Sequence, residues 1–125
     1  MSYNLNIQEE EGLLRVDVAG DRTQGNLVDN AIAACKEAVQ ACNEKGFSRI
    51  LVVSSVTGEY PALHAYEINS KLQECGVQRG WKIAFVNLDL DSFPDMQFAE
   101  TVAVNWGFFG KVFNNEEDAR KWLTC

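Results

Sequence analysis

The apolar run Ile50-Leu51-Val52-Val53, followed by Ser54-Ser55, decides the fold class of this chain. The run is short, rich in β-branched residues and free of polar side chains. This pattern predicts a strand that is covered on both faces, as the strands of parallel sheets are. The segment from Ile83 to Val86 has the same character and predicts a second strand of this kind.

The region before this run predicts two strands of a different type. Apolar and polar residues alternate from Tyr3 to Ile7 and again from Leu14 to Val18. Such alternation indicates strands with one face in water. The segment Glu9-Glu10-Glu11-Gly12 between them is too acidic to bury, and its glycine permits a positive φ, so a hairpin turn is expected there. The first strand would then lie at the edge of the sheet.

Four segments have apolar residues at helical spacing. The predicted helices run from an N-cap at Asn26 to Gly46, from Pro61 to Gly76, from an N-cap at Asp95 to Trp106, and from a capping arrangement of Asn114 and Glu117 to the last residues. A short strand over Lys111–Phe113 precedes the last helix. The order β-β-α-β-α-β-α-β-α predicts one α/β domain over residues 1–125, with a mostly parallel five-stranded sheet.

Composition limits the possible functions. The 125 residues carry a net charge of −7, and the 11 basic residues are spread along the chain without a basic stripe that interleaves with aromatics. Nucleic-acid binding is therefore not expected. The four cysteines have no Cys-x-x-Cys spacing and His64 is the only histidine, so the sequence predicts free thiols, no metal site and a cytoplasmic location. No apolar run is long enough to span a membrane.

Two stretches resemble the SpoIIAA-like branch of the STAS (sulfate transporter and anti-sigma-factor antagonist) fold. The first is Val56-Thr57-Gly58. The second runs Phe98-Ala99-Glu100-Thr101-Val102-Ala103-Val104-Asn105 to Gly107, and continues through Val112-Phe113 to Trp122-Leu123. The resemblance implies helices that lie largely on one face of the sheet. Its wider group includes anti-sigma-factor antagonists and ligand-sensing modules, and the branch is also compared with CRAL-TRIO lipid-binding domains.

The chain departs from the antagonists between the third strand and the second helix. The resemblance implies an Asp followed by a phosphorylated Ser there, but Ser54 stands where the Asp is expected. Ser55 or Thr57 would then have to accept the phosphate. Trp106 also occupies a place that is often Arg in the family, so an anion contact would be lost.

The first candidate site is the loop formed by Ser54, Ser55, Thr57 and Gly58. Ligands of open α/β sheets bind at the carboxyl ends of the strands, where this loop is expected. Free backbone N–H groups and a helix N-terminus would favour an anion or a phosphorylated side chain. The competing interpretation is an ordinary loop whose hydroxyls cap the next helix.

The second candidate site is an apolar pocket lined by Tyr60, Tyr66, Phe98 and Trp106. These aromatics would surround a ligand between the second and third helices. Core packing and an exposed patch for self-association are the alternatives. The acidic residues from Asp89 to Glu100 are not expected to bind calcium, because Pro94 stands where the loop glycine is required.

No catalytic constellation is present: the chain lacks a Gly-x-Ser-x-Gly elbow and a Cys/His arrangement, and no cofactor motif stands out. The sequence favours a non-enzymatic binding module that holds a small apolar or lipid-like ligand. The alternative is a phospho-switched regulator of a protein partner. A homodimer, if formed, would use helix surfaces rather than the polar first strand.

Overall fold

The computed structural model describes residues 3–22, 27–58, 64, 67–68, 70–71, 74–78, 80–105 and 109–124. Its named elements, in chain order, are β1 (Asn4–Glu10), β2 (Leu13–Ala19), α1 (Leu27–Lys45), β3 (Arg49–Ser54), β4 (Lys82–Asn87), η1 (Leu90–Ser92), α3 (Phe93–Asn105), β5 (Phe109–Phe113) and α4 (Glu116–Thr124). The described residues at 64, 67, 68, 70 and 71 are helical. The predicted N-cap Asn26 and the predicted first-turn residue Pro61 lie outside the described residues.

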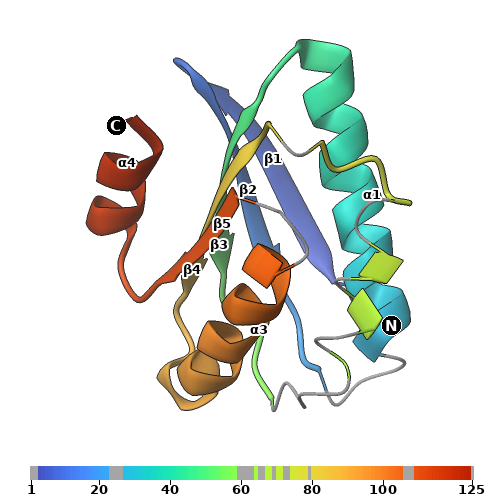
Figure 1. The fold of residues 1–125 in the computed structure, drawn as a ribbon, viewed down its shortest axis with the longest axis vertical. Coiled ribbons are helices and arrows are strands. Elements are labelled where there is room, and N and C mark those ends of the chain that lie inside the picture. Colours follow the sequence, from blue (N-terminus) through green and yellow to red (C-terminus); the bar gives the residue numbers. More distant parts are fainter. Residues whose placement is uncertain are drawn as a thin grey trace.

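The five strands form one sheet in the order β1-β2-β3-β4-β5 (Figure 1). β1 pairs antiparallel with β2, through the predicted hairpin, and Gly12 in its turn has a φ of +80°. All other neighbours are parallel, and Val52 in the central strand pairs with Val16 on one side and Phe85 on the other. The predicted mostly parallel sheet is confirmed, and β1 lies at its edge as expected.

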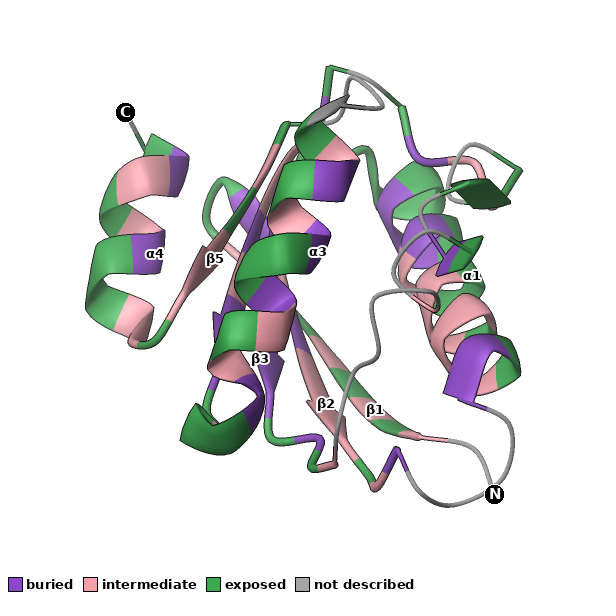
Figure 2. Ribbon diagram, turned by 60° about the horizontal axis from the view of Figure 1, so that its bottom comes forward, coloured by how far each residue is buried: buried purple, intermediate pink, exposed green. Residues whose placement is uncertain are grey.

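The sheet is covered on both faces, which explains why the Ile50–Val53 run has no polar residue. On one face, Ile50 packs with residues of α1 such as Val39 and Cys42. On the other, Leu51 packs with Ala119 and Leu123 of α4. Figures 1 and 2 show α1 and α3 on the same side of the sheet and α4 alone on the opposite side. The helices therefore lie largely on one face, with α4 as the exception.

The predicted start of α3 is three residues too late, and the predicted cap of α4 is one residue too early. α3 begins at Phe93, after the 3₁₀ turn at Leu90–Ser92, so Asp95 lies in its first turn and is not its N-cap. Pro94 is tolerated there because the first turn of a helix has no internal partner for its N–H groups. At α4 the cap is Asn115, whose Oδ1 accepts the backbone N–H of Asp118 at 2.9 Å.

Candidate functional site

The loop that follows β3 is held against the segment that follows β2. The N–H of Ser55 donates to the Val18 carbonyl at 2.9 Å, and the N–H of Thr57 donates to the Gly20 carbonyl at 3.1 Å. The Thr57 carbonyl in turn accepts the N–H of Arg22 at 2.8 Å. The N–H of Val56 donates to Ser54 Oγ at 3.3 Å. The expectation of free N–H groups at Ser55, Val56 and Thr57 is therefore wrong, because all three are used within the protein.

The hydroxyls of this loop differ in accessibility. Ser54 is only 1% exposed, at the end of β3 on the face that bears α1 and α3. Ser55 and Thr57 are exposed. Ser55 Oγ donates to the Val18 carbonyl at 3.3 Å. An enzyme or a partner protein approaching from solvent can therefore reach Ser55 and Thr57 but not Ser54.

A buried arginine, Arg22, holds the same loop through side-chain hydrogen bonds. Arg22 is 7% exposed, and its Nη1 donates to the Gly58 carbonyl at 2.8 Å and to the Val56 carbonyl at 3.4 Å. The same nitrogen donates to Ser92 Oγ at 3.3 Å, and Nη2 donates to the sulfur of Met96 at 3.7 Å. Arg22 thus joins the segment after β2, the loop after β3 and the start of α3. Sequence reasoning misses this role, since Arg22 stands there only as one of the scattered basic residues.

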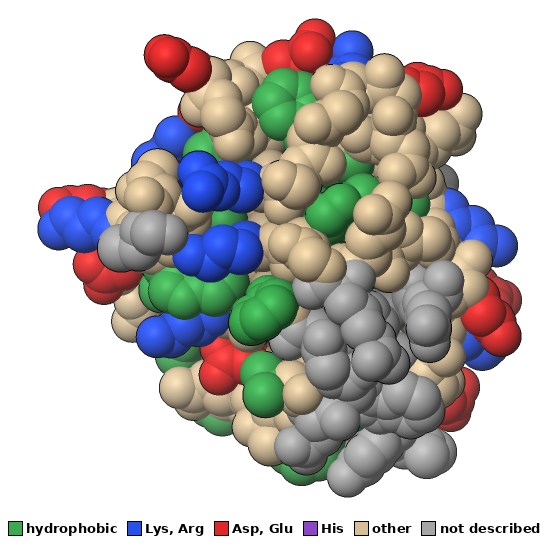
Figure 3. Space-filling view, turned by 45° about the horizontal axis from the view of Figure 1, so that its top comes forward, with side chains coloured by type: hydrophobic (Ala, Val, Ile, Leu, Met, Phe, Trp, Pro, Cys, Tyr) green, Lys and Arg blue, Asp and Glu red, His purple; other side chains and the backbone are tan. Residues whose placement is uncertain are grey.

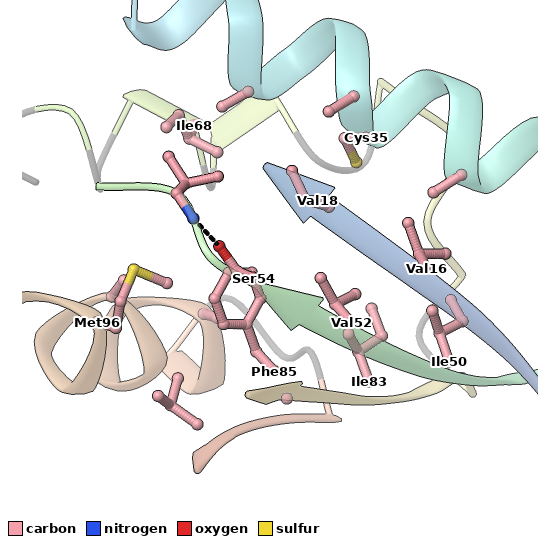
Figure 4. Close-up of a pocket in the computed structure, with 18 of the residues that line it drawn as sticks. Val16, Val18, Cys35, Ile50, Val52, Ser54, Ile68, Ile83, Phe85 and Met96 are labelled. Atoms are coloured by element: carbon pink, nitrogen blue, oxygen red, sulfur yellow. Dashed lines mark hydrogen bonds between the residues drawn. The ribbon is translucent and has the colours of Figure 1, made fainter. Parts of the chain in front are cut away.

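A cavity of about 260 Å³ lies between the sheet and helices α1 and α3 (Figure 4). Its walls are mainly apolar side chains of β2, β3, β4, α1 and α3: Val16, Val18, Ile50, Val52, Ile83, Phe85, Ala31, Ala34, Cys35, Ala38, Met96, Ala99 and Ala103. This volume is slightly below the roughly 300–1,000 Å³ of ordinary ligand pockets. The small side chains of Ala31, Ala34 and Ala38 on α1 leave the space above the sheet that the cavity occupies.

The described residues include only one member of the predicted aromatic pocket, Phe98. Tyr60, Tyr66 and Trp106 lie outside the described residues. Phe98 is 39% exposed and is not among the described residues that line the cavity. The Ser54–Gly58 loop does adjoin it, because Ser54 and Val56 are lining residues. The structure therefore joins the predicted loop to an apolar cavity whose described walls are mainly aliphatic, with Phe85 and Tyr3 as aromatic members.

Few polar side chains reach the cavity: among the described residues they are Tyr3, Arg22, Ser54, Glu100 and Lys111. Glu100 Oε1 already accepts the N–H of Val112 at 2.6 Å. Burial raises the pKa of the Tyr3 hydroxyl, and the positive charge of Arg22 partly opposes that increase. Tyr3 and Arg22 therefore lie close enough to interact at the polar end of the cavity.

Burial makes Cys35 and Cys42 poor candidates for a reactive site. Cys35, Cys42 and Cys75 are free thiols, and Cys125 lies outside the described residues. Burial, with the neighbouring Cys75 as a second cause, raises the pKa of Cys35 to about 12. Burial also raises the pKa of Cys42 to about 11. Both thiols are protonated at neutral pH, and a protonated thiol is a poor nucleophile.

Basic and aromatic residues come together in the folded protein, although they are scattered in the sequence. Lys82 Nζ lies 4.5 Å from the Trp122 ring centroid and donates to the Trp122 carbonyl at 2.7 Å. Lys111 Nζ lies 5.6 Å from the Phe113 ring centroid. Figure 3 shows basic side chains next to hydrophobic ones on one face of the molecule. The Lys82 contacts attach α4 to the sheet.

Metal-binding and membrane-spanning features are both absent from the described part of the chain. No group of three or more His, Cys, Asp or Glu side chains lies close enough to hold a metal ion among those residues. Within the same residues, no helix is long and apolar enough to cross a membrane.

Comparison with known proteins identifies the fold. The structure is similar to the crystal structure of an anti-sigma factor antagonist from Mycobacterium paratuberculosis, with a TM-score of 0.61. The match covers 99% of this chain and 96% of the other, at 11% sequence identity. No protein-family model matches the chain, and no curated protein matches its sequence. The likeness confirms the STAS-type fold that the sequence resemblance implies.

Proposed function

We propose that this chain, which has the STAS fold of anti-sigma-factor antagonists, is a non-enzymatic regulator that binds a protein partner through its Ser54–Gly58 loop. The observation that carries the proposal is the position of Ser55, which is exposed on a loop whose backbone is held by hydrogen bonds to Val18 and Gly20. The solved structure with the same fold is described as an anti-sigma factor antagonist. A fixed backbone with an exposed hydroxyl is a suitable surface for a reversible switch.

Phosphorylation of Ser55 would change this surface in two ways. It would add about −2 charge to a chain that already carries −7. It would also remove the proton that Ser55 Oγ donates to the Val18 carbonyl, and place phosphate oxygens close to that carbonyl. Both effects disfavour a partner that docks on the unmodified loop, so phosphorylation would release the partner.

The test is a pull-down from an extract of the source cells with wild-type protein, Ser55→Ala, Ser55→Asp and Thr57→Asp. We expect the wild type and Ser55→Ala to retain a common partner and Ser55→Asp to retain at least tenfold less of it. Ser48→Asp is the matched control, because Ser48 is exposed at the opposite end of β3 and the charge change is the same. Identical partner recovery from all variants would show that the loop is not the docking site.

The cavity favours a second candidate function, the binding of a small apolar or lipid-like ligand. Its walls are mainly aliphatic, and its volume of about 260 Å³ would hold one short chain. Native mass spectrometry of purified protein, followed by solvent extraction, would test this function. A co-purifying small molecule is expected, and protein that stays empty both as purified and after exposure to lipid extract would contradict it.

A further inference from the structure

The cavity has a polar end and an apolar end. Arg22 and Ser54 both line it, and Val56 links them because its carbonyl accepts from Arg22 while its N–H donates to Ser54 Oγ. Tyr3 joins this end: a β-carbon added at Gly20 would lie 2.7 Å from Cδ1 of the Tyr3 ring, and the charge of Arg22 acts on the Tyr3 hydroxyl. Three hydrogen-bonding side chains therefore meet at the carboxyl ends of the strands.

The rest of the cavity is suited to an alkyl chain. Figure 4 shows Ser54 and Met96 near one end, and Val16 and Ile50 near the other. Its volume of about 260 Å³ corresponds to roughly nine water-sized groups at about 30 Å³ each. A single-chain ligand of about ten to twelve heavy atoms fits that space.

We propose, building on the second candidate function, that the cavity binds a single-chain amphipathic carboxylate of medium length, with its carboxylate at Arg22. A guanidinium matches the planar geometry of a carboxylate and forms strong charge-assisted hydrogen bonds with it. One acceptor of Arg22 Nη2 is the thioether of Met96, which is a weak acceptor, so a ligand oxygen in its place strengthens the bonding. The hydroxyls of Ser54 and Tyr3 supply further donors.

The charges around the cavity also determine the orientation of this ligand. Among the described lining residues, Glu100 on α3 and Lys111 on β5 carry opposite charges, so Arg22 leaves the lining with a net positive charge. A cationic head group would instead face the positive charge of Arg22. An alcohol head group could accept a hydrogen bond from the guanidinium but would bring no opposite charge and no second oxygen. The geometry therefore favours an anion over a cation or a neutral head group of the same chain length.

Isothermal titration of the whole chain with decanoate, 1-decanol and decyltrimethylammonium, below their aggregation concentrations, tests the head group. We expect decanoate to bind at least tenfold more tightly than the other two, and acetate not to bind. Equal affinities for decanoate and 1-decanol would overturn the carboxylate inference and leave the second candidate function intact. Absence of binding by all three would overturn both, while the Ser55 pull-down tests the regulator function independently.

Two substitutions on α1 test whether the ligand binds inside the cavity. Ala38→Leu adds bulk inside the cavity and should weaken decanoate binding at least tenfold. Ala33→Leu is the control, because Ala33 is exposed on the same helix and should leave the affinity unchanged. Both changes keep good helix formers. Wild-type affinity in a folded Ala38→Leu variant would overturn the proposed location.

Arg22→Gln tests the polar end of the cavity. It should weaken the binding of decanoate at least tenfold and leave the affinity for 1-decanol unchanged. Because Arg22 also braces the loop, circular dichroism must show that the variant folds. Tyr3→Phe is the second variant, and it removes only a hydroxyl. It should weaken the binding of decanoate several-fold and leave the affinity for 1-decanol unchanged. If Tyr3→Phe and every folded Arg22 variant keep wild-type affinity for decanoate, the carboxylate does not lie at this end.

Discussion

Gly58 adopts a backbone conformation that few other residues tolerate. Its φ is +98°, and a β-carbon there would lie 3.2 Å from the Cβ of Arg22 and 3.4 Å from the Arg22 nitrogen. We therefore expect Gly58→Ala to lower the free energy of unfolding by about 2 kcal/mol or more, from backbone strain and crowding together. Urea denaturation measures this loss.

Gly12→Ala is the matched control for that substitution. Gly12 also has a positive φ, of +80°, but a β-carbon added there would meet no atom within 4 Å. Only the backbone contribution of about 1 kcal/mol should then be lost. Equal losses at Gly58 and Gly12 would show that the contact with Arg22 does not constrain the loop.

At the level of residues, Ser54 and Arg22 differ in how far sequence could predict them. Ser54 directly follows an apolar strand run, so its place at the end of a buried strand could be predicted. Arg22 contacts residues 34, 70 and 74 positions away in the chain, in the β3 loop and near α3. No local pattern encodes a role that depends on two distant segments of the chain.

Among the elements, α4 is attached to the β1–β2 hairpin by an ion-pair network. Arg120 donates to Glu10 at 2.7 Å and to Glu116 at 2.9 Å, and Arg15 pairs with Glu116 at 2.7 Å. The hydrogen bonds from Arg120 are the first cause that lowers the pKa of Glu10 and of Glu116 below 4.5. The network therefore links the final helix to the start of the sheet.

This network predicts a pH dependence of stability. A carboxylate whose pKa is lowered by folding stabilises the protein above its unfolded pKa, and the gain is lost as pH falls through the folded pKa. The wild-type protein should therefore lose part of its free energy of unfolding as the pH falls from 7 to 3. In Arg120→Gln this loss should be smaller. The change should be about 1 kcal/mol or less, because all three side chains are about one-third exposed.

Urea unfolding of wild type and variant at both pH values measures that difference. Lys121→Gln is the control, since the Lys121–Glu117 pair is 71% and 79% exposed and should contribute almost nothing. An Arg120→Gln protein with the wild-type pH dependence would show that the network does not hold α4 to the hairpin.

The existence and order of the elements could be predicted better than their ends. α1 ends as expected, because Gly46 has a φ of +77° and ends the helix. The sequence pattern places the start of α3 too late, because Pro94 is typical of a loop although the first turn of a helix also accepts it. Asn114 and Asn115 are both capable caps, and only the structure shows that Asn115 is the one that bonds to Asp118.

At the scale of the whole molecule, the two faces of the sheet are packed differently. The α4 face contains a cluster of fully buried residues, including Leu51, Ala84 and Leu123. The opposite face contains the cavity. Val52 and Val53 are neighbours in β3 and point to opposite faces, so they allow a matched comparison.

We expect Val53→Ala to cost about 2 kcal/mol of unfolding free energy and Val52→Ala about 1 kcal/mol. Val53 is buried in the close-packed cluster, where truncation leaves a new void. Val52 already borders the cavity, so it loses fewer contacts. Thermal and urea denaturation of both variants provide the measurement, and a larger loss at Val52 would mean that the cavity side is the better packed face.

The topology of the molecule could be predicted because each apolar run marks a strand covered on both faces, and each helix between them requires a crossover. The cavity could not be predicted in the same way. Its size depends on the separation between α1 and the sheet, which follows from packing along the whole interface. The alanines of α1 are compatible with a cavity and equally with a close approach of helix to strand.

The solitary position of α4 has a consequence for synthesis on the ribosome. Leu51, Val53, Ala84 and Val86 are covered on that face by a helix that is translated after all five strands. A nascent chain in which β3 and β4 have paired therefore presents this apolar surface to water until residues 116–124 have left the exit tunnel. During that interval, chaperones that recognise aliphatic surfaces would find a binding site that the mature protein hides.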